Sequence, residues 1–369
     1  MKAQQKQMRI LHIMNGAVLG GISTVVLNYY KHMNREKYHF DCAMTNIALG
    51  PNGIALENLG CKMYKLPLKS KHPFAYIKTL HHILWQGQYD GIHVHSNTTS
   101  FFPLVIAIFS GIKVRVAHAH AAMLPQSCMG KIKRFAGMIF MPIVATKLVA
   151  CSANAGSAIF GKRIIELGKL VVLKNAINAE EFVFDQSVRA KVRLSLSIED
   201  EFVLGCVGNL GVEKNHIYAL KVLSEIKKID EKYCMLLIGD GPLSQVLRNE
   251  ARILGIEDAV HFLGRRTDIN DLLNAMDAFL MPSLYEGFGL AALEASASGL
   301  PLFLSENMPK DMNFYSKCTY LSIKTDPKIW AKEIMLIGRN PEREKGVAEV
   351  KHAGYDITSN INAFEAIYE

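Results

Sequence analysis

The sequence predicts an α/β protein built from two doubly wound parallel sheets. Short apolar segments with the composition of strands alternate with helical segments in both halves of the chain, an order typical of parallel sheets. The chain has 369 residues, of which 50% are hydrophobic, enough for two cores of ordinary size. We place the boundary near Asn178, in a polar stretch, so that the two domains comprise residues 1–178 and 179–349.

The expected strands are short and apolar. In the first half they include residues 9–13, 91–95, 114–117, 148–151 and 171–173; in the second half they are 203–207, 234–238, 260–263, 278–281 and 302–304. In sheets of this kind, ligands bind at the carboxyl ends of the strands. Residues that directly follow these strands are therefore the candidates for a functional site.

Cysteine spacing and hydropathy exclude several classes of protein. The 7 cysteines are scattered without a Cys-x-x-Cys pair, so the sequence predicts neither a disulfide framework nor a zinc site. Residues 1–9 are polar, and no stretch approaches the roughly 20 apolar residues that span a bilayer. We therefore expect a cytoplasmic protein.

Charge is distributed unevenly along the chain. Residues 1–180 contain 21 basic and 6 acidic side chains, a net charge of +15, whereas the remaining residues carry −7. Such a basic half favours an anionic partner, which is nucleic acid, an acidic polymer or the cytoplasmic face of a membrane. No nucleic-acid-binding module is recognisable, so we favour an anionic membrane surface and expect no nucleic acid.

Two apolar segments are candidates for membrane contact. Lys131, Lys133 and Arg134 lead directly into the apolar residues 135–145, a combination suited to a lipid interface. Residues 101–109 form a similar segment. Either segment is equally compatible with a helix buried against the sheet.

The segment from Glu286 to Glu294 is the most informative part of the sequence. Gly287 and Gly289 allow a sharp turn and the close approach of a ligand, and the apolar residues 290–297 continue at helical spacing. Bare N–H groups at such a helix start favour a phosphate. Glu286 precedes this helix and Glu294 lies inside it. Eight residues of continuous helix would turn the two carboxylates roughly 80° apart, so we expect them to bind different parts of one ligand. A lone Glu-Gly pair is also compatible with a capped helix and two solvated glutamates.

Several further motifs accompany this segment in a fixed order. They are Gly20-Gly21-Ile22 and residues 89–95, 114–120, 172–178, 207–215, 236–243, 262–268 and 353–357. Together with Glu286-Gly-Phe-Gly-Leu, they resemble the retaining GT-B glycosyltransferases of the Glu-x7-Glu group (glycosyltransferase family 4-like), and among these the capsular and exopolysaccharide enzymes. The resemblance covers nearly the whole chain. It implies two Rossmann-like domains facing a central cleft, with a last helix, about residues 350–369, that returns to the first domain.

The resemblance implies a donor site in the second domain. Lys214 would bind the diphosphate, Glu286 the hydroxyls of the donor sugar, and Glu294 the ribose hydroxyls. The turn with Gly287 and the N–H groups of Phe288, Gly289 and Leu290 would bind sugar or diphosphate oxygens.

One position departs from the pattern of the family. Most relatives have an arginine after Gly208 as a second diphosphate contact, whereas this chain has Asn209, an uncharged donor. Catalysis is then slower, or Arg265 or Arg266 compensates.

The resemblance also implies roles in the first domain. Gly20 and Gly21 would let the backbone approach the phosphates and the acceptor. His120 would lie near the anomeric carbon and hydrogen-bond the donor sugar, although His118 is the alternative if the alignment slips by two residues. His93 and His95 are structural or face the acceptor. The expected catalytic residues are thus His120, Glu286 and Lys214.

These roles imply a reaction without a covalent enzyme intermediate. The acceptor hydroxyl attacks from the face that the diphosphate leaves, because no carboxylate is a convincing nucleophile. We expect no metal and no cofactor, since cationic side chains and a helix end can replace a metal and no Asp-x-Asp motif is present. The expected donor is a UDP-sugar, the expected acceptor is a polyprenyl-diphosphate-linked saccharide, and the expected location is the inner face of the cell membrane, with peripheral attachment.

Three other functions remain open at this point. A GT-B nucleotide-sugar epimerase or phosphorylase would share the architecture, and an inactive homologue in a polysaccharide assembly complex would be compatible with Asn209. A nicotinamide-dependent oxidoreductase is disfavoured, because Gly-x-Gly-x-x-Gly does not follow the first strand.

Overall fold

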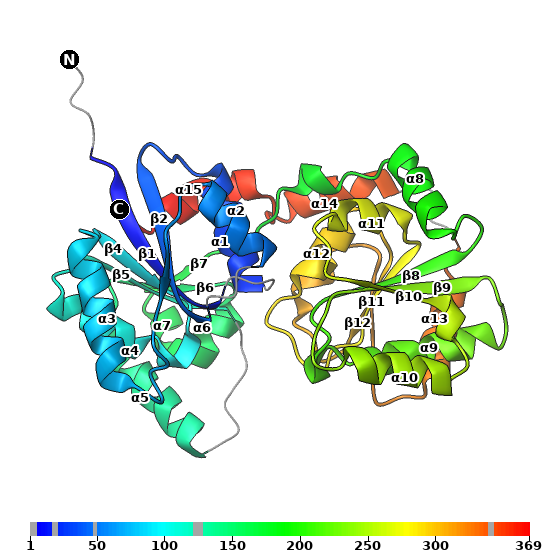
Figure 1. Ribbon diagram of the computed structural model, residues 1–369, viewed down its shortest axis with the longest axis horizontal. Helices are drawn as coiled ribbons and strands as arrows, with labels where there is room; N and C mark the ends of the chain where they lie inside the picture. Colours follow the sequence, from blue (N-terminus) through cyan, green and yellow to red (C-terminus); the bar gives the residue numbers. More distant parts are fainter. Residues whose placement is uncertain (1–5, 17–20, 47–49, 121–127, 339–342) are drawn as a thin grey trace. The chain divides into compact units, whose positions relative to one another are not determined.

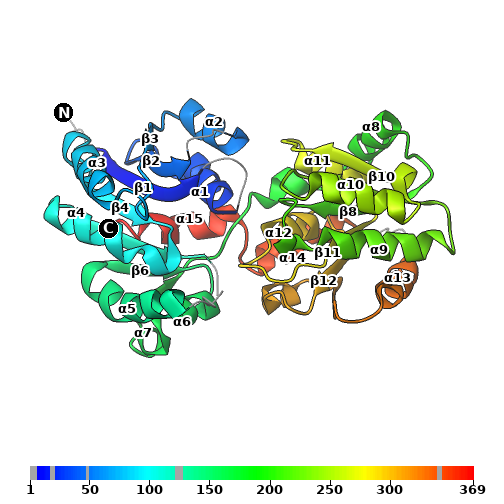
Figure 2. The same ribbon diagram turned by 60° about the horizontal axis from the view of Figure 1, so that its bottom comes forward.

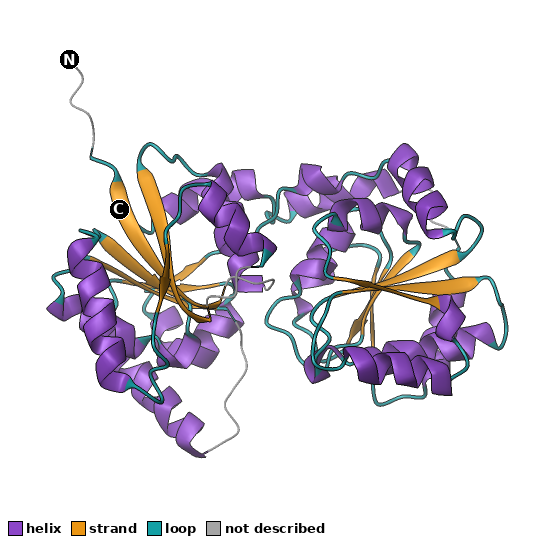
Figure 3. Ribbon diagram, viewed as in Figure 1, coloured by secondary structure: helices purple, strands orange, loops and turns teal. Residues whose placement is uncertain are grey.

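The computed structural model covers residues 1–369 and describes residues 6–16, 21–46, 50–120, 128–338 and 343–369. The chain divides into two units, one formed by residues 1–176 and 357–369 and the other by residues 177–356. Each unit has a parallel sheet with helices on both faces (Figures 1 and 3). The predicted α/β class with two Rossmann-like units is confirmed.

The first unit contains a seven-stranded parallel sheet with the order β3-β2-β1-β4-β5-β6-β7. Its strands are β1 (Met8–Gly16), β2 (Tyr38–Asn46), β3 (Met63–Lys65), β4 (Gly91–Val94), β5 (Val114–Ala119), β6 (Lys147–Ala150) and β7 (Leu170–Val172). Its helices are α1 (Gly21–His32), α2 (Pro51–Asn58), α3 (Pro73–Gln86), α4 (Phe101–Phe109), α5 (Cys128–Val144), α6 (Ala153–Phe160), α7 (Lys162–Glu166) and α15 (Ile357–Glu365). The strand order reverses direction between β1 and β4, so the carboxyl ends of these two strands border a crevice of the kind that binds ligands.

The second unit contains a six-stranded parallel sheet with the order β10-β9-β8-β11-β12-β13. Its strands are β8 (Phe202–Val207), β9 (Tyr233–Ile238), β10 (Val260–Gly264), β11 (Ala278–Met281), β12 (Leu302–Ser305) and β13 (Cys318–Leu321). Its helices are α8 (Gln186–Leu196), α9 (His216–Lys227), α10 (Ser244–Ile253), α11 (Ile269–Ala275), α12 (Leu290–Ala297), α13 (Pro327–Met335) and α14 (Gly346–His352). The corresponding reversal lies between β8 and β11.

Continuous burial of the strands explains why they were visible in the sequence. All six residues of β9 are buried, as expected for a strand covered by helices on both faces. Leu236 and Leu237 pack into cores on opposite faces of the sheet, because successive side chains of a strand alternate. The edge strand β13 was not predicted, because its four residues are all half-buried and mixed in polarity.

The last residues of the chain complete the first unit. The α15 helix lies beside α1 (Figure 2), and Phe364 stacks on Tyr29 with a ring-centroid distance of 4.2 Å. Burial of these aromatic rings covers the face of the sheet that carries Phe40. The fold of the first unit therefore depends on residues far apart in sequence.

Candidate functional site

The loops after β8 and β11 bring two predicted residues into contact. Lys214 and Glu286 form an ion pair in which the side chains are 19% and 12% exposed. The hydroxyl of Ser283 also donates to Oε1 of Glu286 at 3.0 Å. The Glu286 carboxylate is thus held by one cation and one hydroxyl at the carboxyl edge of the sheet.

Backbone contacts fix the two loops to each other. The N–H of Leu284 donates to the carbonyl of Glu213 at 2.8 Å, and Nδ2 of Asn215 donates to the carbonyl of Pro282 at 3.1 Å. Asn215 adopts the left-handed conformation, with φ of 53°, directly before α9, a conformation that asparagine tolerates. The position of Lys214 is therefore set by its backbone as well as by its partner.

The glycine after β8 leaves room for the lysine side chain. A Cβ atom at Gly208 would lie 3.3 Å from Cε and 3.6 Å from Cδ of Lys214. The stem of Lys214 therefore passes over the backbone of Gly208, and this close approach accounts for a glycine at that position.

The helix α12 begins at the predicted glycine-rich turn. Gly289 precedes it with φ of 96° and no side chain caps its amino end, so its first N–H groups are free to bind an anion. Phe288 is buried and packs against Tyr355, which leaves only its backbone for a ligand. Gly287 is half-buried, as is Leu290, the first residue of the helix.

Glu286 precedes this helix and Glu294 lies inside it, as the sequence predicted, but the expected angle between them is wrong. Because α12 begins at Leu290, no continuous helix joins Glu286 to Glu294, and the angle of roughly 80° does not apply. The two carboxylates nevertheless have different surroundings. Glu286 is paired, whereas none of the residues that the structure describes hydrogen-bonds the carboxyl of Glu294.

The carboxyl group of Glu294 is unusual in its protonation. Burial, and after it the charge of Glu181, raises its pKa to about 7. A half-buried carboxyl group that no described residue hydrogen-bonds and whose pKa lies near neutrality is typical of a ligand-binding position.

Asn209 and the two arginines after β10 lie on exposed loops of the same sheet. Nδ2 of Asn209 donates to Oε1 of Glu213 at 3.2 Å. Arg265 pairs with Asp240 at 3.4 Å, and Nε of Arg266 donates to Asp268 at 2.8 Å. The ion pair of Arg265 is longer and more exposed than that of Arg266. The Arg265 side chain can therefore turn more easily toward a ligand.

In the first unit, His120 directly follows β5. It is 8% exposed, its backbone N–H donates to Oδ1 of Asn97 at 3.0 Å, and burial lowers its pKa to about 3. Gly21 begins α1 and is exposed, while Gly20 lies outside the described residues.

His120 belongs to a cluster of buried histidines that sequence reasoning missed. The cluster consists of His12 on β1, His93 and His95 on and after β4, and His118 and His120 on and after β5. Two groups of three, His12 with His93 and His95, and His95 with His118 and His120, have ring nitrogens within 4.8 Å of one another. The available signal was the pair of His-x-His motifs on neighbouring strands, since residues two apart share a face.

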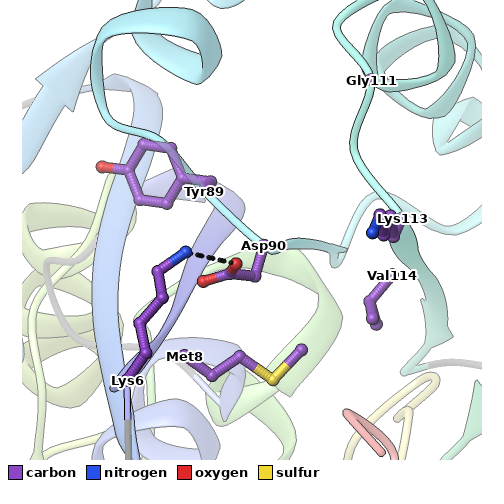
Figure 4. A pocket seen from close by; sticks show the side chains of 7 residues that line it. All are labelled: Lys6, Met8, Tyr89, Asp90, Gly111, Lys113 and Val114. Carbon is purple, nitrogen blue, oxygen red and sulfur yellow. Dashed lines mark hydrogen bonds and ion pairs between the residues drawn. The ribbon is translucent and has the colours of Figure 1, made fainter.

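A cavity of about 360 Å³ lies elsewhere in the first unit (Figure 4). It is lined by Lys6, Met8, Tyr89, Asp90, Gly111, Lys113 and Val114, and Lys6 pairs with Asp90 at 3.1 Å. These residues lie at the amino ends of β1, β4 and β5, opposite the edge that carries the histidines. None of the predicted site residues lines this cavity, so we do not assign the site to it.

Comparison with known proteins gives a family match over most of the second unit. Residues 188–350 match the family model of the glycosyl transferases group 1. This range includes Lys214, Glu286 and Glu294, so these predicted site residues lie within the segment that is similar to that family.

Relatives extend the similarity over nearly the whole chain. EpsF of Bacillus subtilis, a presumed glycosyltransferase by its name, is 29% identical over 98% of this chain and 96% of its own. An Escherichia coli galactosyltransferase, named for transfer from UDP-Gal to α-D-GlcNAc-diphosphoundecaprenol with an α-1,3 linkage, is 27% identical over 83% of this chain and 81% of its own. HepE of Anabaena, solved in complex with UDP-glucose, superposes with a TM-score of 0.80 at 17% identity over 98% of this chain and 99% of its own. The last comparison shows a shared fold, and the first two show similarity to glycosyltransferases.

Proposed function

We propose that the protein is a retaining glycosyltransferase that moves a sugar from a nucleotide diphosphate sugar to a lipid-linked saccharide in capsular or exopolysaccharide synthesis. The observation that carries this proposal is the Lys214–Glu286 pair beside the uncapped start of α12. This pair places a cation and free N–H groups next to a carboxylate that can accept hydrogen bonds. All of these groups lie within the segment that matches the glycosyltransferase family model.

Lys214 and the start of α12 stabilise the leaving group. Breaking the bond between sugar and phosphate builds negative charge on the nucleoside diphosphate, and preorganised positive groups lower the energy of that state. Without donor, the ammonium group of Lys214 is held by Glu286. When the donor binds, Lys214 turns to the diphosphate, and the carboxylate of Glu286 becomes available to the sugar hydroxyls while Ser283 keeps it in place.

Glu294 and His120 are the remaining donor contacts that we propose. Glu294 has no protein partner among the described residues and accepts the ribose hydroxyls as a carboxylate. His120 is neutral and hydrogen-bonds the donor sugar. Arg265 substitutes in part for the arginine that Asn209 replaces.

Transfer proceeds with retention and without a protein nucleophile. The acceptor hydroxyl attacks the anomeric carbon from the face that the diphosphate leaves, and a phosphate oxygen takes the proton. Double displacement needs a free carboxylate on the opposite face, whereas the carboxylate of Glu286 is held by Ser283 and binds the sugar hydroxyls. Because Lys214 and the helix end supply the positive charge, turnover is expected to resist EDTA.

The relatives support the choice of substrates. The Escherichia coli relative is named for a UDP-sugar donor and a diphosphoundecaprenol-linked acceptor, and HepE was solved with UDP-glucose. We therefore propose a UDP-sugar as donor and a polyprenyl-diphosphate-linked saccharide as acceptor.

The α5 helix supports attachment to the cytoplasmic face of the membrane. Its exposed apolar residues are Ile132, Phe135, Ile139, Phe140 and Ile143, with exposed fractions from 45% to 70%. Their spacing places them on one side of the helix, next to the exposed Lys131; the side chain of Lys133 lies outside the described residues. This apolar side within a half of net charge +15 suits an anionic lipid surface.

The α4 helix differs from α5 and is assigned to the core. Leu104, Ile106 and Ala107 are buried in the first unit, and Phe109 at its end is 82% exposed. Among the helices formed by described residues, none is long and apolar enough to cross a bilayer. Flotation with anionic liposomes tests the role of α5: Phe135→Ser with Ile143→Ser should abolish binding, Ile229→Ser should not, and indifference of the wild type to anionic lipid would contradict the proposal.

A thermal-shift panel of nucleoside diphosphates and their sugars tests the donor. A ligand present at about 100 times its Kd stabilises the folded chain by roughly 2.7 kcal/mol, so selective stabilisation identifies the base and the sugar. The selected donor is then incubated with and without a polyprenyl-diphosphate saccharide. Product that forms only with the acceptor supports transfer, product without acceptor indicates an epimerase or phosphorylase, and binding without any turnover indicates an inactive homologue.

A further inference from the structure

The five buried histidines of the first unit form ordered hydrogen-bonded chains. His12 and His93 face each other in the register of β1 and β4, and β5 pairs with β4 on its other side. Three parallel strands therefore deliver all five rings to the carboxyl edge of this sheet. One chain joins Tyr368, His93 and His118, and the other joins His12, His95 and His120.

The second of these chains leads from the interior of the first unit to His120. Nδ1 of His12 lies 3.0 Å from Nε2 of His95, and Nδ1 of His95 lies 2.7 Å from Nε2 of His120. Both ring nitrogens of His95 are used. His12 is fully buried, whereas His120 is the most exposed ring of the five, at 8%.

Neutral rings restrict this chain to two arrangements. Burial lowers the pKa of His12 and of His120 to about 3, and that of His95 well below its usual range. Each ring then has one N–H and one lone pair. Because both contacts join an Nδ1 to an Nε2, all three rings must carry their proton on the same kind of nitrogen.

The buried end of the chain selects between the two arrangements. Nε2 of His12 is buried and has no partner among the described residues. Buried N–H groups without an acceptor are rarer than acceptors without a donor, so Nε2 of His12 is assigned the lone pair. His12 then donates from Nδ1 to His95, and His95 donates from Nδ1 to His120.

We propose that His12 and His95 hold His120 in its Nδ1–H form, so that His120 donates a hydrogen bond to an oxygen of the bound donor and does not act as a base. The identity of that oxygen as part of a nucleotide sugar rests on the proposed function. His12 and His95 are positioning residues, since they act only through His120.

The distances favour this arrangement over a metal site. Two imidazole nitrogens on one tetrahedral zinc ion lie about 3.3 Å apart, given Zn–N bonds of about 2.0–2.1 Å. The two contacts of the chain measure 3.0 and 2.7 Å, with the nitrogens facing each other in pairs. Each pair is therefore joined by one proton.

Long-range ¹H–¹⁵N correlation spectra of the full chain, labelled with ¹⁵N-histidine, report which nitrogen of each ring is protonated. The rings are assigned from spectra of single substitutions at positions 12, 95 and 120. His12, His95 and His120 should all show the Nδ1–H form between pH 6 and 8. Protonation at Nε2 of His120, different forms along the chain, or one equivalent of zinc in the purified protein would overturn the inference.

A pair of substitutions separates positioning from folding. His12→Phe removes the N–H that His95 accepts, so His120 should no longer show a single Nδ1–H form. His12→Asn places an amide N–H near the former Nδ1 and should restore it. Loss of an entire donor costs about 10²–10³-fold in kcat, so partial loss should lower kcat by about tenfold in His12→Phe, with KM unchanged and recovery in His12→Asn.

The spectra test the protonation of the rings and the kinetics test glycosyl transfer, so either expectation can be contradicted without the other. The expected protonation without glycosyl transfer would leave the inference standing and remove the proposed function. Active enzyme whose His120 carries its proton on Nε2 would remove the inference and leave the function. Any folded substitution at positions 12, 95 and 120 serves to assign the rings in the wild-type spectrum, so one variant that does not fold leaves the test intact.

Discussion

The carboxyl edges of the two sheets share a strand topology but differ in electrostatics, since one carries ions and the other neutral side chains. In both units the strand order reverses beside the central strand, and side chains from the following loops meet at that edge. The second unit places ions there, with Lys214 bound to Glu286, and Glu294 lies on α12. The first unit places neutral imidazoles there. The topology determines where side chains meet, and residue type alone determines what they can bind.

Burial explains why the two edges differ. Lys214 and Glu286 are partly exposed and paired, which keeps their desolvation penalty low. The imidazoles lie where a charge would have no compensating partner, so burial keeps them neutral. A charged edge suits the diphosphate of a donor, and a neutral edge of aligned rings suits hydroxyl groups.

The largest expected difference between the units is their response to acid. Below pH 6.5 the histidines of an unfolded chain take up protons, whereas His12 and His120 remain neutral in the folded chain down to about pH 3. The unfolded state then binds more protons, so the free energy of unfolding falls by about 1.4 kcal/mol per pH unit for each such histidine. The first unit has five of them, while the second has His216 and His261.

The two tryptophans allow this difference to be measured. Trp330 is fully buried in the second unit, and Trp85 is 70% exposed in the first. In a Trp85→Phe variant titrated from pH 7 to pH 4, the helical circular dichroism should fall before the Trp330 emission changes. His82→Gln, at an exposed position, is the control and should leave both midpoints in place. If circular dichroism and Trp330 emission change at the same pH, the expected difference in acid stability between the two units is contradicted.

Removal of Lys214 should have the next largest effect. Lys214→Ala deletes the cation proposed to meet the leaving diphosphate, so kcat/KM should fall by about 10²–10³-fold. Lys228→Ala removes an exposed lysine that pairs with Glu225 and is the matched control. Steady-state kinetics with the selected donor provides the measurement, and a loss of less than fivefold would show that the charged edge does not act on the leaving group.

The pH dependence of donor binding sharpens the comparison further. Glu294, with its pKa raised to about 7, loses its charge as the pH falls from 8 to 6, whereas His12 and His120 stay neutral over this range. Hydrogen bonds to a charged acceptor are worth about 1 kcal/mol more than neutral ones, so the Kd for the nucleotide sugar should rise by roughly fivefold. Calorimetry at both pH values checks this. Glu294→Gln should flatten the profile, and a profile unchanged by that substitution would contradict the assignment.

The smallest effect concerns a feature that both units share. Ser152 caps α6 by accepting from Ala155 at 3.2 Å, and Asp326 caps α13 by accepting from Lys328 at 2.9 Å. Replacement of either by alanine should cost about 1 kcal/mol of stability in urea unfolding. Losses of similar size would show that the units differ at their sheet edges and not in ordinary helix capping.

Much of the fold could be predicted because parallel strands are local signals. Buried strands such as β9 are continuous apolar runs, and the residues after them were correctly expected at the carboxyl edge. The pairing of Lys214 with Glu286 could not be predicted, because the two residues are 72 positions apart and meet only through the pairing of β8 with β11.

The histidine cluster shows the same limit more clearly. His93 with His95, and His118 with His120, are visible as motifs, but their meeting with His12 depends on the order β1-β4-β5. The rings are neutral because they are buried, and their burial could not be predicted from the sequence without the strand order. The start of α12 at Leu290 was by contrast predictable, because Gly289, with φ of 96°, ends the glycine-rich turn directly before the apolar residues 290–297.

The discontinuous first unit has a consequence for biosynthesis. Residues 357–369 supply α15 and the hydroxyl of Tyr368 that contacts His93, yet a ribosome releases them only after the 180 residues from 177 to 356. At about 5–20 residues per second, that interval lasts roughly 10–40 s. During this time the nascent amino-terminal segment exposes the aromatic face that Phe364 and Tyr368 later cover, and the contiguous second unit is complete before that face is covered. Domains usually fold in the order of their synthesis. In this chain the second unit is complete before the first, so we expect the opposite order.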